Sequence, residues 1–135
     1  MRCTKLDQLV EQMENYLECW KQFNRFLNLG REKRFSQEDD SQFLEIKSVI
    51  VQELEMILAT IEVAAPTREE VHALVSSAPS LRYLSEMNDG AVRNLENQWH
   101  KIYIGWHAIL GQVKVRRRLE QPKSAFASLF GDLKK

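Results

Sequence analysis

The chain has three histidines, which are candidate metal ligands. His100 and His107 are seven residues apart, about 10.5 Å along a helix, so one metal ion cannot bind both. The helical two-histidine zinc pattern needs a spacing of four, and a di-iron bundle needs two Glu-x-x-His pairs. The sequence has one such pair, Glu69 with His72. We therefore expect no metal and no cofactor. Glu96 lies four residues before His100, a spacing that allows a structural hydrogen bond between them.

Cysteine is the strongest nucleophile among the remaining side chains. Cys3 and Cys19 fall in one predicted helix, about 24 Å apart, so they cannot pair with each other while that helix is intact. The chain has no Gly-x-Ser-x-Gly, no phosphate-binding glycine loop and no dinucleotide fingerprint. We expect two reduced thiols, with an intermolecular disulfide as the alternative, and no catalytic residue. An enzyme would need a cavity lined by Trp99, Tyr103 and Trp106.

The composition favours long helices in one domain. The chain has 135 residues, 44% of them apolar and 28% charged, with five glycines and three prolines. No apolar run reaches the roughly 18 residues that cross a bilayer, and the N-terminus lacks the apolar core of a secretion signal. We therefore expect a cytoplasmic protein.

Apolar residues spaced alternately by three and four predict the helices and their buried faces. The first helix should run from Thr4 to Leu29, with Gly30 as its left-handed C-cap. The second should begin after the N-cap Ser36, paired with Asp39, and end near Val63. The predicted inner faces are Leu6, Leu9, Met13, Tyr16, Trp20, Phe23 and Leu27 in the first helix, and Phe43, Ile46, Ile50, Leu54, Ile57 and Ile61 in the second.

Prolines and turn residues divide the second half of the chain. Pro66 ends the second helix, Thr67 and Glu70 form a capping box, and Pro79 breaks the third helix. Asn88-Asp89-Gly90 is typical of a turn. The last long helix should run from Ala91 to Leu119 and end before Pro122. Its predicted inner face is Val92, Leu95, Trp99, Ile102, Trp106, Ile109 and Val113.

These elements predict an all-α fold. We expect an up-down-up-down helical bundle with three long helices, a fourth broken at Pro79, and a short C-terminal tail helix. The bundle domain should cover residues 1–121 and the amphipathic tail residues 122–135. Gly105, Ala108 and Gly111 place small side chains in the last long helix. Gly105 beside Ala108 would let a neighbouring backbone approach closely, or the same notch would receive a ligand or partner helix.

Charge is balanced overall but unevenly distributed. Residues 36–65 are acidic and residues 114–135 are basic. Such asymmetry marks a surface for a charged partner, or acidic and basic elements that face one another within the fold. The candidate charged surface is Lys114, Arg116, Arg117 and Arg118. A helix C-terminus favours such cations in any case, and phosphate contacts are the alternative use.

The tail is the most informative functional feature of the sequence. Phe126, Leu129, Phe130 and Leu133 follow the i, i+3, i+4, i+7 spacing of a helix that binds in a groove. The tail can fold back on its own bundle, bind a partner protein, or lie on a membrane surface. Its last six residues, Phe130 to Lys135, are similar to the C-terminal targeting peptides of encapsulin cargo. Asp132 and Phe130 depart from that pattern, and the metal or haem signatures of such cargo are missing, so no family assignment follows.

Taken together, the residues indicate a non-catalytic helical protein–protein interaction or adaptor module. Its partner would be another protein, bound through the tail or an exposed helix face, with a homo-oligomer as a further possibility. The alternative is a nucleic-acid or membrane-surface binder that uses the basic end of the last long helix together with the tail. The sequence identifies no small-molecule substrate.

Overall fold

The computed structural model describes residues 4–61 and 66–120, and within these ranges the chain is entirely helical, without strands. The all-α prediction is therefore confirmed, as are the three long helices. The predicted tail helix, its apolar residues Phe126, Leu129, Phe130 and Leu133, and the division at residue 121 lie outside the described residues. The helices are α1 (Thr4–Glu32), α2 (Gln37–Thr60), α3 (Arg68–Ser77), α4 (Leu81–Glu86) and α5 (Asp89–Leu119).

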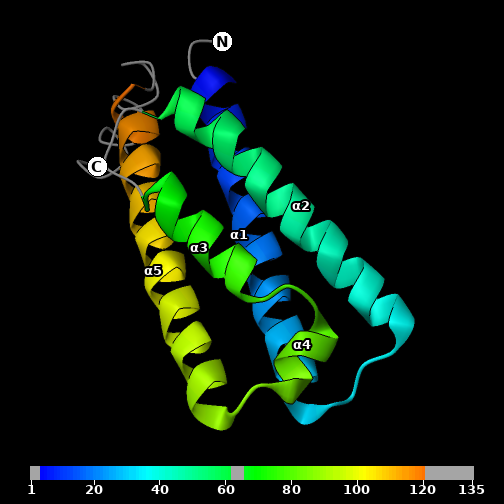
Figure 1. The fold of residues 1–135 in the computed structure, drawn as a ribbon. Helices are drawn as coiled ribbons and strands as arrows, with labels where there is room; N and C mark the ends of the chain where they lie inside the picture. Colours follow the sequence, from blue (N-terminus) through cyan, green and yellow to red (C-terminus); the bar gives the residue numbers. More distant parts are fainter. Residues whose placement is uncertain (1–3, 62–65, 121–135) are drawn as a thin grey trace, which may run out of the picture.

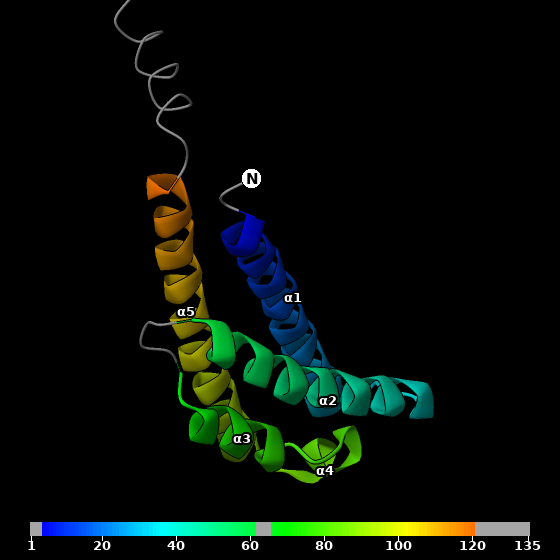
Figure 2. The same cartoon turned by 90° about the horizontal axis from the view of Figure 1, so that it is seen from above.

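Helix α1 is the centre of the packing. It contacts α5, α2 and α4, while α3 fills the space between α5 and α2. Figure 1 shows α5 running antiparallel to α1 along most of its length, with α2 crossing α1 obliquely. Seen from above, α2 and the α3–α4 segment lie across the α1–α5 pair (Figure 2). The three long helices pack together as predicted, and the interrupted α3–α4 segment closes the remaining side.

The core is built from the apolar stripes that face α1 and its neighbours. Trp20, Phe23, Phe43, Leu54 and Trp106 are completely buried. The aromatic rings form a continuous cluster, with Phe23 and Phe43 5.3 Å apart and Tyr16 edge-on to Trp106 at 5.3 Å between ring centroids. Each such burial contributes about 1.5–3 kcal/mol relative to exposure, so this cluster is the main source of stability.

Side-chain caps fix where the helices begin. Ser36 and Asp39 form the predicted capping box at α2, with the Ser36 hydroxyl accepting from the Asp39 amide at 3.1 Å. Thr67 and Glu70 do the same at α3. Pro79 lies between α3 and α4 and interrupts the helix as predicted. The neighbouring Ser80 is the N-cap of α4. Each cap satisfies backbone amides that have no helical carbonyl as a partner. The caps could be predicted because the capping side chain and these amides are close in sequence.

The predicted C-cap at Gly30 is wrong. Helix α1 continues to Glu32, and Lys33 adopts the left-handed conformation with φ 60°. The amide of Lys33 donates to the Gly30 carbonyl and that of Arg34 to the Leu29 carbonyl, both at 3.1 Å. This pair of bonds is a Schellman motif built on lysine in place of glycine. Gly30 instead permits close packing, because a Cβ atom there would lie 3.0 Å from the Cβ of Leu84.

Two other predicted boundaries differ from the structure. Asn88 does not open a turn but is the N-cap of α5, its side chain accepting from the Ala91 amide at 2.8 Å. The helix therefore begins at Asp89, two residues before the prediction. Helix α2 ends at Thr60, three residues before the predicted Val63, with Ile61 as its C-cap.

Tertiary polar contacts hold the α3–α4 break against α2. The Leu81 amide donates to Asp40 Oδ1 at 2.8 Å, and Lys47 Nζ donates to the Pro79 carbonyl at 3.1 Å. Burial lowers the pKa of the Lys47 ammonium, and nearby Asp40 opposes that shift. Asp40 and Lys47 thus satisfy two of the backbone groups that the interruption at Pro79 leaves without helical partners.

Candidate protein-binding surfaces

The basic cluster at the end of α5 lies beside acidic residues of α1. Lys114 Nζ is 3.4 Å from a Glu14 carboxylate oxygen, and Arg117 Nη1 is 3.6 Å from Asp7 Oδ1. Arg116 and Arg118 occupy the same last turn, where the helix dipole favours cations. Two of the four predicted charged-surface residues therefore pair within the fold. The acidic partners Glu14 and Asp7 both belong to α1.

The histidines take no part in a shared site. His72, His100 and His107 are all exposed, and the described residues contain no group of three or more ligands placed to hold a metal ion. Glu96, the residue considered as a hydrogen-bond partner of His100, forms an ion pair with Arg31, with 2.7 Å between Glu96 Oε1 and Arg31 Nη2. His107 contacts the Tyr103 ring edge-on, with 4.6 Å between centroids.

Trp20 and Trp106 are fully buried as predicted, and Trp99 is partly buried against the same core. Trp99 stacks on Tyr103 at 4.7 Å, and its Nε1 donates to the Trp20 carbonyl at 2.8 Å. The buried Nε1 atoms of Trp20 and Trp106 have no hydrogen-bond acceptor among the described residues. Trp99, Tyr103 and Trp106, the residues that an active site would need, line none of four hollows on the described part of the chain.

Small residues on α5 have two different environments. A Cβ atom on Gly105 would lie 3.0 Å from Pro66 Cγ, so this glycine accommodates the turn that precedes α3. Pro66, Gly105 and Ala108 line a hollow of about 280 Å³. A Cβ atom on Gly111, in contrast, would have no atom of the described chain within 4 Å. A close neighbour is thus found at Gly105 as predicted, but it is the ring of Pro66 and not a backbone, and Gly111 has open space beside it.

An apolar stripe runs along the outer face of α5. Ile104 and Val115 are each 53% exposed and Leu119 is 73% exposed, and the smaller Ala108 and Gly111 between them are also exposed. Ile104, Val115 and Leu119 were not predicted as binding residues from the sequence. The signal was available, because these residues fall on the helix face opposite the predicted inner stripe. The α5 outer stripe consists of Ile104, Ala108, Gly111, Val115 and Leu119.

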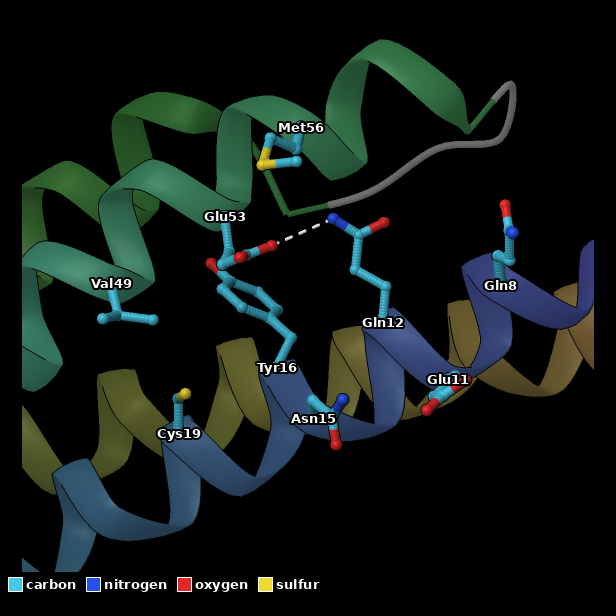
Figure 3. A pocket seen from close by; sticks show the side chains of 9 residues that line it. All are labelled: Gln8, Glu11, Gln12, Asn15, Tyr16, Cys19, Val49, Glu53 and Met56. Atoms are coloured by element: carbon cyan, nitrogen blue, oxygen red, sulfur yellow. Dashed lines mark hydrogen bonds between the residues drawn. The ribbon is translucent and has the colours of Figure 1, made fainter. Parts of the chain in front are cut away.

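A groove between α1 and α2 is the second candidate surface. It consists of two hollows, of about 330 Å³ and about 580 Å³, that meet at Val49. Figure 3 shows the first hollow, with Gln12 Nε2 donating to Glu53 Oε2 at 2.9 Å across it. Both hollows together form the α1–α2 groove, lined by Gln8, Glu11, Gln12, Asn15, Tyr16, Cys19, Gln22, Arg25, Phe26, Gln42, Glu45, Ile46, Ser48, Val49, Glu53 and Met56.

Burial shifts the pKa values of two side chains that line the groove, Cys19 and Tyr16. Burial raises the pKa of the Cys19 thiol, and the carboxylates of Glu53 and Glu18 add to the shift. Burial also raises the pKa of the Tyr16 hydroxyl, which stays protonated and donates to the Ile50 carbonyl at 3.1 Å. The raised pKa favours the neutral thiol form of Cys19. A nucleophilic cysteine, in contrast, has a lowered pKa. Cys3 lies outside the described residues.

Comparisons with known proteins assign no family. No protein-family model matches the chain, and no curated protein and no solved structure is significantly similar to it. No helix in the described ranges is long and apolar enough to span a bilayer.

Proposed function

We propose that this chain is a non-catalytic helical protein–protein interaction module that binds a helix of another protein on the α5 outer stripe. The observation that carries the proposal is the exposure of this stripe. Ile104, Val115 and Leu119 are large apolar side chains that remain more than half exposed in a fold that buries its other long stripes. Contiguous exposed apolar surface of this kind is typical of a site of association.

The spacing along the stripe suits a helical partner. Its members follow one another at intervals of four, three, four and four residues, which keeps them on one face of α5. Gly111 lies near the middle with open space above it. A large side chain of a partner helix can enter this space, as a knob enters a hole in coiled-coil packing.

The charges around the stripe define the chemistry of the partner. Lys101 and Arg118 are exposed beside it. A partner helix with an apolar face and acidic flanks would meet these cations favourably and be drawn to them in the encounter. The basic cluster supports this proposal over phosphate or membrane binding, because Lys114 and Arg117 are paired with Glu14 and Asp7.

Site-specific photo-crosslinking tests the proposal in the cells that make the protein. A photoreactive residue is placed at Gly111 or Val115, and at Glu38, an exposed position on α2, as the control. We expect one partner to crosslink from the two stripe positions and not from Glu38. With the purified partner, Val115→Glu should raise the Kd at least tenfold while leaving the melting temperature unchanged, because Val115 is exposed.

Two results would contradict the proposal. One is the absence of any stripe-specific crosslink; the other is a partner whose affinity Val115→Glu does not change. Light scattering distinguishes a further case, since a dimer that Val115→Glu dissociates would identify the partner as a second copy of this chain in place of a different protein.

A further inference from the structure

We propose that residues 123–135 of this chain bind as an amphipathic helix in the α1–α2 groove of the same molecule. The proposal concerns a different surface from the α5 outer stripe and does not depend on the function proposed for it. It follows from three properties of the groove: its apolar positions, its charge, and its place next to the end of α5.

The apolar positions of the groove match those of the tail in spacing. Val49 and Met56, one on each side of Glu53, are exposed and seven residues apart on α2. Ile46, which is partly exposed, extends the apolar surface into the second hollow, where Arg25 lies over the ring of the buried Phe26. In the tail, Phe126, Leu129, Phe130 and Leu133 also span seven residues on one helical face. A helix presenting such a face is the usual occupant of an apolar groove between two helices.

The groove is acidic and the tail is basic. Glu11, Glu45 and Glu53 line the groove, and Arg25 is the one base among its described lining residues. The tail carries three lysines, at 123, 134 and 135, against Asp132. The α5 outer stripe, by comparison, is bordered by Lys101 and Arg118, which have the same sign as the tail. Charge complementarity therefore selects the groove over the stripe as the place where the tail binds.

One end of the groove lies near the end of α5, the helix that precedes the tail in the sequence. The contact between Arg117 and Asp7 places the end of α5 beside the start of α1, and Gln8, the next residue of α1, lines the first hollow. From Glu120 to Phe126 an extended chain reaches about 20 Å. As a helix, residues 123–135 would measure about 20 Å, while the groove from Gln8 to Phe26 is about 27 Å long. The tail can thus enter and lie along the groove.

Amide hydrogen exchange on the full chain tests this placement. In the wild type we expect the amides of residues 126–133 to exchange at least tenfold more slowly than an unstructured peptide. The double substitution Glu11→Lys and Glu53→Lys should remove most of that protection. Glu32→Lys with Glu86→Lys makes the same charge change at exposed positions outside the groove, and should preserve it. Circular dichroism verifies that both variants remain folded.

Alkylation of Cys19 gives an independent readout, because Cys19 lines the groove and a bound tail would cover it. With Cys3→Ser as background, a neutral alkylating reagent should modify Cys19 at least fivefold faster once Phe126→Asp and Phe130→Asp release the tail. These substitutions lie outside the described helices, so they test occupancy without changing any residue of the described core.

Three outcomes would overturn the proposal. The first is free exchange of the tail amides in the wild type, together with Cys19 alkylation rates that are the same with and without Phe126→Asp and Phe130→Asp. The second is protection that survives the groove substitutions but is lost with Val115→Glu, which would place the tail on α5. The third is protection that appears only at concentrations where light scattering finds a dimer, which would make the occupant the tail of a second copy.

Discussion

Gly30 packs so closely against Leu84 that a Cβ atom added to Gly30 would lie 3.0 Å from the Leu84 Cβ. This contact joins the last turns of α1 to α4, the six-residue helix that follows the break at Pro79. Leu84 is almost fully buried there, as is Leu81. The absence of a side chain at Gly30 is therefore what lets the short α4 pack closely on the central helix.

Substituting Gly30 should destabilise the fold, and Gly111 offers the matched control. Gly30→Leu would push α4 away from α1 and lower the free energy of unfolding by about 1–3 kcal/mol, the usual cost of overpacking. Gly111→Ala meets no neighbour and should raise stability by about 0.5–1 kcal/mol through helix propensity alone. Urea unfolding of the two variants measures both effects. A stability loss at Gly111 as large as that at Gly30 would contradict this account of Gly30.

The hydrogen bond from Trp99 to the Trp20 carbonyl should contribute to the pairing of α1 with α5. Trp99→Phe keeps an aromatic ring on Tyr103 but removes the Nε1 donor, which lies 2.8 Å from that carbonyl. We expect a loss of about 0.5–1.5 kcal/mol in the free energy of unfolding, the typical net value of such a bond. Unchanged stability in denaturant titrations would show that water replaces the donor without cost.

The buried faces of the long helices were predictable because burial leaves a periodic trace in the sequence. In α2, for example, Phe43, Ile50, Leu54 and Ile57 are fully buried at the predicted spacing. The caps at Ser36 and Thr67 were predictable for a similar reason, since donor and acceptor are three residues apart. Signals of this kind are local, so they do not require knowledge of the tertiary fold.

Features that depend on tertiary neighbours could not be predicted. The sequence shows that Gly30 and Gly105 are glycines, but not that Leu84 and Pro66 are the groups that approach them. It shows the excess of bases at the end of α5, but not that Glu14 and Asp7 of α1 pair with Lys114 and Arg117. The α1–α2 groove was missed for the same reason, because its residues come from both helices and follow no single period.

Asp40 should be needed to hold the interrupted segment in place. Its Oδ1 accepts from the Leu81 amide at 2.8 Å, at a helix start whose amides have no helical carbonyl to bind. Asp40→Ala should lower the free energy of unfolding by about 1–3 kcal/mol, the range for a hydrogen bond to a charged group. Asp40→Asn, which keeps an acceptor, should recover part of the loss. Amide exchange at Leu81 that is faster in Asp40→Ala but not in Asp40→Asn would show that the loss of stability comes from this hydrogen bond.

Acidification should weaken the contact between α2 and α3 through Glu55. Hydrogen bonding and charge attraction by Arg68, whose Nη2 lies 2.8 Å from Glu55 Oε1, lower the pKa of this carboxyl below its ordinary value. Since the pKa is lower in the folded than in the unfolded chain, the stabilisation is complete at neutral pH. It is lost as the pH falls from the ordinary glutamate value through the folded one.

The difference in melting temperature between the wild type and Glu55→Gln should therefore shrink as the pH is lowered from about 6 to about 3. Arg68→Gln should remove this pH dependence of the stability, because the Glu55 carboxyl then loses the partner that lowers its pKa. Both side chains are about half exposed, so added salt should also reduce the effect. NMR titration of the Glu55 carboxyl gives the direct measurement, and a pKa at or above that of an unperturbed glutamate would show that the pair does not stabilise the fold.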